Sequence, residues 1–107
     1  MKINHIFRFE KLRDGGSLIV SFQSDDSCEY WVMFPVANLE SKQTKFKNPM
    51  LVNRTTGLEV ELSQLGAKQW LSRLAPLFYA RDELPQVSKQ SEERILGDML
   101  ALCEESD

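Results

Sequence analysis

The pattern of apolar and polar residues predicts a sheet built around residues 28–36, the segment CEYWVMFPV. Apolar side chains occupy both alternating faces of this segment. Tyr30 and Phe34 share one face, and Trp31 and Met33 lie on the other. A strand that is apolar on both faces is typical of the middle of a sheet, with something packed on each side. We therefore expect the remaining strands to flank this segment.

Two further strands are predicted before the central segment. Residues 2–11 alternate with a period of two, which is typical of a strand with one solvated face. The apolar face comprises Ile3, His5, Phe7 and Phe9, and Ile6 is the exception. Residues 13–16, RDGG, predict a hairpin turn, because glycine accepts a positive φ at little cost. Residues 18–23 alternate again, and the polar residues 24–27 predict the next turn.

A second hairpin is predicted beyond the polar loop of residues 37–49. Residues 50–53 and 58–62 flank a turn at residues 54–57, RTTG. In the returning strand Leu58, Val60 and Leu62 are expected to face inward, and Glu59 and Glu61 outward. One strand of this hairpin should pair with the far side of residues 28–36. The sheet would then have about five antiparallel strands.

The apolar period changes to that of a helix after residue 62. One helical face is formed by Leu65, Trp70, Leu71, Leu74, Leu77 and Phe78. Ser63 is the predicted N-cap, because its hydroxyl can accept a hydrogen bond from an unpaired amide of the first turn. Pro76 lies inside the pattern and predicts a kink, and a helix end near Ala75 is the alternative.

A second helix is predicted after the connector of residues 81–90. Ser88 or Ser91 is its expected N-cap, and Glu92 and Glu93 would favour the helix N-terminus. Its apolar stripe consists of Ile95, Leu96, Met99, Leu100 and Cys103. Residues 104–107 are acidic and are expected to fray at the helix C-terminus. The chain is thus predicted to form a single α+β domain over residues 1–107, with the antiparallel sheet packed against two C-terminal helices.

Composition excludes several classes of protein. The chain has 107 residues, a net charge of −3, 42% hydrophobic and 27% charged residues, which is typical of a soluble globular domain. The acidic balance argues against nucleic-acid binding, which requires a cationic surface. No segment approaches the ~20 apolar residues of a membrane-spanning helix, and the start lacks the apolar region of a signal peptide. A cytoplasmic location and no membrane association are expected.

The charges are distributed unevenly along the chain. Residues 41–57 contain four cations and no anion, whereas residues 82–107 contain eight anions. The four cations are Lys42, Lys45, Lys47 and Arg54. One interpretation is that the two segments complement each other within or between subunits. The other is that the cations contact an anionic partner.

Residues for catalysis or metal binding are sparse. His5 is the single histidine, and Cys28 and Cys103 are the two cysteines, so neither a metal site nor a cofactor is predicted. Because His5 is in line with Phe7 and Phe9, it is expected to be half-buried and hydrogen-bonded. A catalytic base is the alternative, and it would need a cleft and a second polar side chain beside His5. No catalytic residue is predicted.

The apolar face that carries Trp31 and Met33 needs a cover. The second hairpin, a helix, a second subunit or a binding partner could supply it, and cover by the chain itself is the first interpretation. For function we favour a non-enzymatic binding or regulatory module that acts through protein–protein contact, with a homodimer as one form. Its predicted contact residues are Trp31, Met33, Lys42, Lys45, Lys47 and Arg54. The alternatives are a site for an apolar or aromatic ligand near Trp31, Trp70 and Phe78, and an enzyme that uses His5.

Overall fold

The computed structural model describes residues 2–12, 16–35 and 48–104 of the chain. Its elements are β1 (Ile3–Lys11), β2 (Leu18–Ser24), β3 (Glu29–Phe34), β4 (Met50–Asn53), β5 (Glu59–Glu61), α1 (Gln64–Tyr79) and α2 (Gln86–Glu104). Strands therefore precede helices, as the change in apolar period predicts. None of the described helices is long and apolar enough to cross a membrane.

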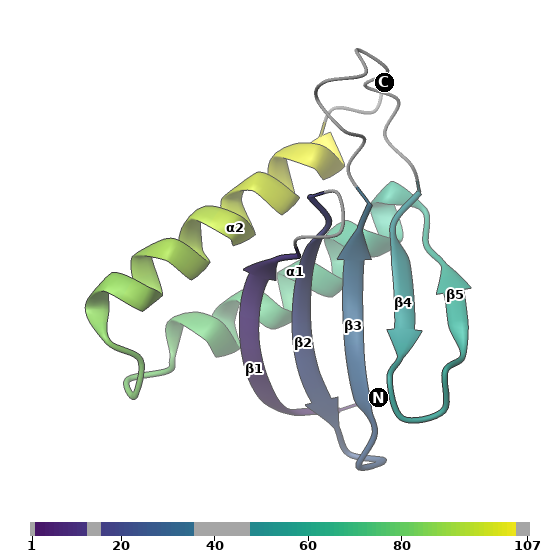
Figure 1. Cartoon of the computed structure of the whole chain (residues 1–107), viewed down its shortest axis with the longest axis horizontal. Helices are drawn as coiled ribbons and strands as arrows, with labels where there is room; N and C mark the ends of the chain where they lie inside the picture. Colours follow the sequence, from purple (N-terminus) through teal and green to yellow (C-terminus); the bar gives the residue numbers. More distant parts are fainter. Residues whose placement is uncertain (1, 13–15, 36–47, 105–107) are drawn as a thin grey trace.

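The strands form one antiparallel sheet in which their spatial order equals their order in the chain (Figure 1). β3 lies in the middle, with β2 on one side and β4 on the other. The second hairpin therefore supplies the far-side partner that residues 28–36 require. The predictions of an α+β fold, of five strands and of a central position for this segment are confirmed.

Both helices pack on one face of the sheet. In Figure 1, α1 crosses behind the strands and α2 lies beside β1. The buried core between sheet and helices contains Ile6, Phe9, Leu18, Val20, Phe22, Tyr30, Val32, Phe34, Ala67, Leu71, Leu74, Phe78, Leu96, Met99 and Cys103. The helices therefore cover the face of β3 that carries Tyr30 and Phe34, a choice that the sequence leaves open.

β1 does not keep a simple alternation. Its pairing with β2 shifts register between Ile3 and His5 and again between Ile6 and Arg8. Such irregularities change which side chains face the core. As a result Ile6 and Phe9 are buried, whereas His5 and Phe7 are exposed. The predicted inward face of this strand is wrong for His5 and Phe7, and Ile6 belongs to the core.

β5 lies at the outer margin of the sheet and is exposed throughout. The row that contains Val60 continues through Leu51 on β4 to Val32 on β3, so Val60 does point to the helix-covered side. The helices do not shield it, and Val60 and Leu58 are 47% and 65% exposed. The alternation was predicted correctly, but the expected burial of Leu58 and Val60 is wrong.

α1 begins as predicted. The hydroxyl of Ser63 accepts a hydrogen bond from the Gly66 N–H at 2.9 Å. Its buried residues are Ala67, Leu71, Leu74 and Phe78. Leu65 and Leu77, which the pattern also placed on the inner face, are exposed. The helix continues through Pro76 to Tyr79, so the alternative of a helix end near residue 75 is wrong.

α2 begins earlier than predicted. Its first residue is Gln86, ahead of both predicted caps, Ser88 and Ser91. The carbonyl of Pro85 accepts the N–H of Lys89 at 2.9 Å, which makes it the first acceptor of the helix. Proline suits a helix start because its missing N–H would have no partner there.

Candidate functional site

The face of the sheet opposite the helices carries a second set of apolar side chains. We call this surface the helix-free face, and its central residues are Ile19, Ser21, Trp31, Met33, Met50 and Val52. They come from β2, β3 and β4, the three inner strands. Both described helices lie on the other side of the sheet.

The strand register arranges these side chains in rows. Trp31 lies opposite Val52, and Met33 lies between Ile19 and Met50. Ile19 and Val52 are buried, whereas Trp31, Met33 and Met50 remain half-buried. The centre of the face is therefore apolar and still offers surface from its three largest side chains.

Charged residues continue the same rows onto the outer strands. Arg8 and Glu10 on β1 flank one side and form an ion pair with 3.4 Å between Arg8 Nε and Glu10 Oε2. Glu59 and Glu61 on β5 flank the other side. An apolar centre with a polar rim is the usual anatomy of a protein–protein interface.

A clamped turn places a cation on the central tryptophan. The Arg54 guanidinium carbon lies 4.0 Å from the Trp31 ring centroid, which is a cation–π arrangement. The Arg54 N–H donates to the Glu29 carbonyl at 2.7 Å, and the Thr55 hydroxyl accepts the Glu29 N–H at 3.0 Å. The Asn53 side chain accepts the Thr55 N–H at 2.9 Å and holds the turn itself. Arg54 is therefore fixed to β3 by its backbone, which orients its side chain.

The turn between β2 and β3 is held by one carboxylate. Asp26 accepts hydrogen bonds from the Ser24 hydroxyl, the Cys28 N–H at 2.9 Å and the Tyr30 hydroxyl at 2.7 Å. These bonds, that of Ser24 first, lower the pKa of Asp26 from 3.8 to about 2. The same contact with Asp26 raises the pKa of Tyr30. The cluster keeps the carboxylate charged and fixes the turn that enters the central strand.

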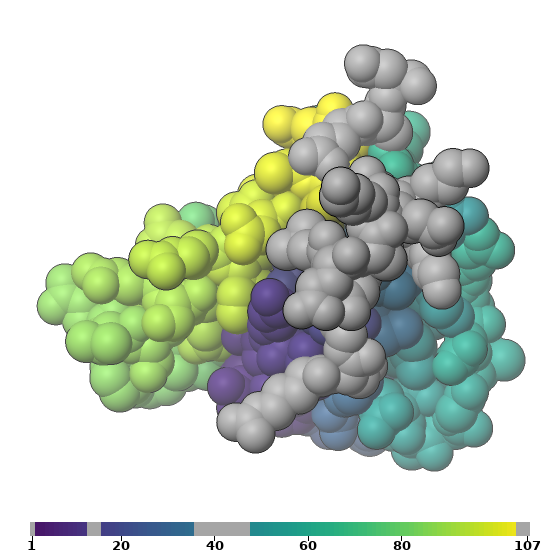
Figure 2. Space-filling view, turned by 45° about the horizontal axis from the view of Figure 1, so that its top comes forward, coloured from purple at the N-terminus to yellow at the C-terminus, as the bar shows by residue number. Residues whose placement is uncertain are grey.

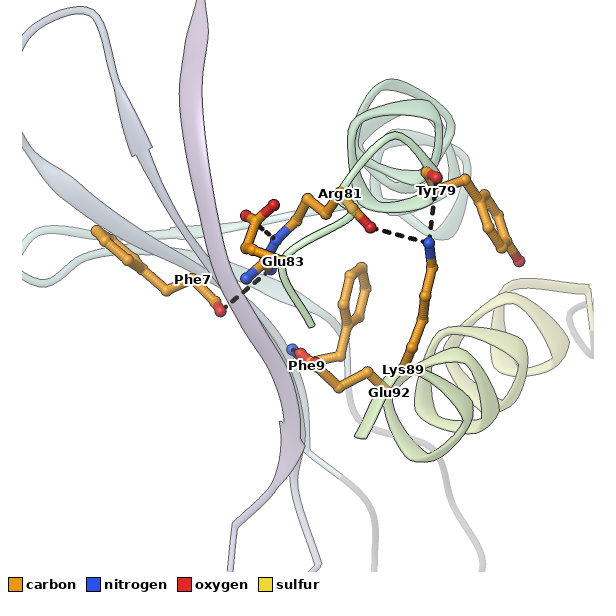
Figure 3. A network of polar contacts seen from close by, with 7 residues as sticks. All are labelled: Phe7, Phe9, Tyr79, Arg81, Glu83, Lys89 and Glu92. Carbon is orange, nitrogen blue, oxygen red and sulfur yellow. Dashed lines mark hydrogen bonds and ion pairs between the residues drawn. The ribbon is translucent and has the colours of Figure 1, made fainter. Parts of the chain in front are cut away.

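Side chains from the helical half of the chain cover the outer edge of β1 (Figure 3). Arg81, in the connection after α1, donates from Nη1 to the Phe7 carbonyl at 3.2 Å and pairs with Glu83 at 3.2 Å. Glu92 on α2 is buried and accepts the Phe9 N–H at 2.7 Å. A cation and an anion thus satisfy a carbonyl and an amide that would otherwise face outward from the sheet.

Lys89 fastens the same region. Its ammonium group donates to the Tyr79 carbonyl at 3.3 Å and to the Arg81 carbonyl at 2.9 Å, at the end of α1 (Figure 3). A lysine near the carbonyls of a helix C-terminus is a favourable cap. These two bonds hold α2 against the end of α1 and support the placement of Arg81 and Glu92.

A cleft of about 500 Å³ lies between β1 and the first half of α2. Its lining includes Phe9, Lys11, Leu84, Val87, Glu92 and Ile95. None of the predicted contact residues lines it, and neither does His5. Its buried charged group, Glu92, is already bonded to β1.

The structure brings together some of the predicted contact residues. Trp31 and Met33 share the helix-free face, and Arg54 joins them through the cation–π contact. The predicted cations Lys42, Lys45 and Lys47 lie outside the described residues.

The two alternative sites receive little support. His5 is exposed, and its ring packs edge-on against Phe7 with centroids 5.1 Å apart. Trp31 lies on the helix-free face, whereas Trp70 and Phe78 belong to α1 on the other side of the sheet. These three aromatics cannot line one cavity. In the part of the chain that the structure describes, no three His, Cys, Asp or Glu side chains are placed to hold a metal ion.

Sequence reasoning missed the role of Glu92. The sequence predicts that Glu92 lies in the first turn of the second helix, as a charge that favours the N-terminus. The structure places it in the second turn, buried against β1. A signal was present, because Glu92 precedes Leu96, Met99 and Cys103 at helical spacing and shares their face. An acidic residue in line with an apolar stripe predicts a buried partner.

Comparisons of the chain with protein-family models, with curated proteins and with solved structures gave no match.

Proposed function

We propose that this protein is a non-enzymatic binding module that acts through protein–protein contact, with the helix-free face as its contact surface. The observation that carries the proposal is the contact between Trp31 on the central strand and Arg54 in the turn that follows β4. Tryptophan and arginine are enriched among the residues that dominate interface energies. Here a rigid strand and a clamped turn hold both before any partner arrives, which reduces the entropy lost on binding.

The surroundings of the pair support the same function. Half-buried Met33 and Met50 extend the apolar centre, and methionine adapts well to partner surfaces. The charged residues of β1 and β5 form a rim of both signs. A rim of this kind contributes specificity and association rate more than affinity. A second copy of the chain could occupy the face, which would make the protein a homodimer.

Site-specific photo-crosslinking in the native cells tests the proposal. A photoreactive phenylalanine analogue would replace Met33 beside Trp31 on the helix-free face, and in a matched protein it would replace Val87, which is 76% exposed on α2. We expect a discrete protein adduct from position 33 and none from position 87. The mass of the adduct separates a different protein from a second copy. Equal adducts at both positions, or none at position 33, would contradict the proposal.

Once the adduct is identified, two alanine variants measure the contribution of the pair. Trp31→Ala should weaken binding by about 2 kcal/mol or more, which is roughly 30-fold. Because Trp31 also packs within the sheet, Arg54→Ala is the cleaner variant, since Arg54 is exposed. Arg94→Ala, an exposed arginine on α2, is the control and should bind normally. Loss of binding by Arg94→Ala equal to that of Arg54→Ala would argue against the helix-free face.

A further inference from the structure

Among the described residues, no further strand pairs with the outer edge of β5. Asn53 N–H donates to the Leu58 carbonyl at 2.8 Å, and Leu62 N–H donates to the Pro49 carbonyl at 2.7 Å. In an antiparallel ladder, alternate residues direct their backbone groups to the same neighbour. Leu58, Val60 and Leu62 thus bond to β4, and the amides and carbonyls of Glu59 and Glu61 point away from the sheet. Among the described residues, nothing hydrogen-bonds to these outward groups.

The side chains along this edge have a regular chemistry. Glu59 and Glu61 are exposed on the helix-free face, and Val60 between them is exposed on the opposite face. Leu58 extends the apolar side of the edge. A strand laid beside β5 would therefore meet anion, apolar group and anion in alternation. Its complement is an extended segment in which basic residues flank an apolar one.

The same charges disfavour a second copy of this strand. Antiparallel pairing of two β5 strands about Val60 would place Glu59 of each directly opposite Glu61 of the other. Like charges that face each other across a strand pair are destabilising, whereas opposite charges are stabilising. The charges of β5 thus disfavour pairing with a second copy of this strand and favour pairing with a cationic one.

We propose that β5 is a strand-addition site for an extended basic–apolar–basic segment of a partner protein. Backbone hydrogen bonds to Glu59 and Glu61 would supply the pairing. Two basic side chains would meet the two carboxylates, of which that of Glu61 also accepts a hydrogen bond from the Asn48 side-chain amide. The apolar residue would pack beside Val60. This contact shares Glu59 and Glu61 with the rim of the helix-free face, but it does not depend on the Trp31–Arg54 pair.

The test uses the full chain and synthetic peptides in which lysine alternates with valine. Peptides with the same composition in scrambled order, and peptides with glutamate in place of lysine, are the controls. We expect the alternating basic peptide to bind and to slow hydrogen exchange at the amides of Glu59 and Glu61. N-methylation of the peptide amides that face β5 should abolish binding, and methylation of the other set should not.

Charge reversal separates this site from non-specific attraction to an acidic protein. The double variant Glu59→Lys/Glu61→Lys should bind the basic peptide at least tenfold more weakly and gain binding of the glutamate peptide, which also shows that it is folded. Asp82→Lys/Asp98→Lys changes the net charge equally at two exposed positions in the helical half and should stay within twofold of the parent protein.

Several results would overturn the proposal. Among them are failure of the alternating peptide to bind, equal losses in the two double variants, and protection at amides other than those of β5. Protection of the Glu59 and Glu61 amides by self-association without peptide would replace it with a dimer edge. Because Trp31 and Arg54 stay unchanged in these variants, failure here leaves the helix-free face to be judged by its own crosslinking experiment.

Discussion

β1 and β5 are the two outer strands of the sheet, and they differ in whether described side chains bond to their outward backbone groups. On β1, Arg81 and Glu92 bond to the outward carbonyl of Phe7 and the outward amide of Phe9. On β5, the corresponding groups of Glu59 and Glu61 have no partner among the described residues. Exposed strand edges favour pairing with other chains, and proteins commonly cover or charge them. Here one edge is covered by side chains and the other carries charges that leave its backbone accessible.

The difference follows from where the helices lie. α2 runs beside β1, so a carboxylate on its second turn reaches the strand and replaces the carbonyl of a missing neighbour (Figures 1 and 3). α1 starts almost directly after β5 and leads away behind the sheet. No described helix therefore runs along β5. A helix that docks beside a sheet can close one edge, and the opposite edge then becomes the place where a partner strand can add.

The largest expected effect is on the free energy of unfolding, and it compares the packing of β1 with that of β5. Phe9→Ala removes a fully buried ring that packs edge-on against Phe78 with centroids 5.1 Å apart, and should lower the free energy of unfolding by about 3–5 kcal/mol. Val60→Ala on β5 should change it by no more than about 0.5 kcal/mol. Urea denaturation measures both. Similar losses would show that β5 is packed as firmly as β1.

The next effect tests the closure of the β1 edge. Glu92→Ala removes a charged acceptor from the Phe9 N–H and should cost about 1.5–3 kcal/mol of unfolding free energy. Glu92→Gln keeps a side-chain acceptor and should recover part of this loss. Asp98→Ala, an exposed acid on the same helix, is the control. Denaturation gives the energies, and faster hydrogen exchange at the Phe9 amide identifies the bond that was lost. An unchanged Phe9 amide would contradict the role of Glu92.

A smaller effect tests the direction of the β5 backbone. Proline removes an N–H donor, so Val60→Pro should break a bond to β4 and cost about 1 kcal/mol more than Glu59→Pro. The Glu59 amide points outward and has no bond to lose. Thermal or urea denaturation of the two variants provides the comparison. If Glu59→Pro were the more damaging variant, the amide of Glu59 and not that of Val60 would bond to β4. That result would contradict the strand-addition proposal.

The smallest effect concerns the turn between β2 and β3, which takes no part in the contacts at either edge of the sheet. The pKa of Asp26 falls from 3.8 unfolded to about 2 in the fold. A lowered pKa stabilises the fold above about pH 4, and this stabilisation is lost as the pH falls toward 2. Asp26→Asn should therefore show a shallower loss of unfolding free energy between these pH values. Acid titration of both proteins measures it, and parallel curves would contradict the assignment.

Several features were predictable from local chemistry. The apolar faces of residues 28–36 predicted a central strand, and the Arg54–Gly57 turn predicted a hairpin that completes the sheet. Ser63 predicted the start of α1. Each depends on residues close together in the chain, where side-chain period, turn preference and capping act directly on the backbone.

Other features could not be predicted in the same way. Register irregularities in β1 reversed the expected facing of His5 and Phe7. Val60 has the right alternation for burial, yet it lies beyond the reach of the helices. Of the predicted contact residues, Trp31, Met33 and Arg54 lie on one face. The cation–π contact of Arg54 with Trp31 accompanies a backbone hydrogen bond from Arg54, in the turn after β4, to Glu29 on β3. Such contacts arise between segments whose relative placement local patterns do not specify.

By itself, the sequence determined the order of strands and helices and the central place of the tryptophan-bearing strand. It could do so because periodicity and composition act within each segment. Only the tertiary structure decided which face of that strand the helices cover, and that Glu92 and Arg81 bond to the outward backbone of β1 while none of the described residues does so on β5. Those outcomes depend on where α2 docks, and docking is set by the packing of the whole core rather than by any single stretch of the chain.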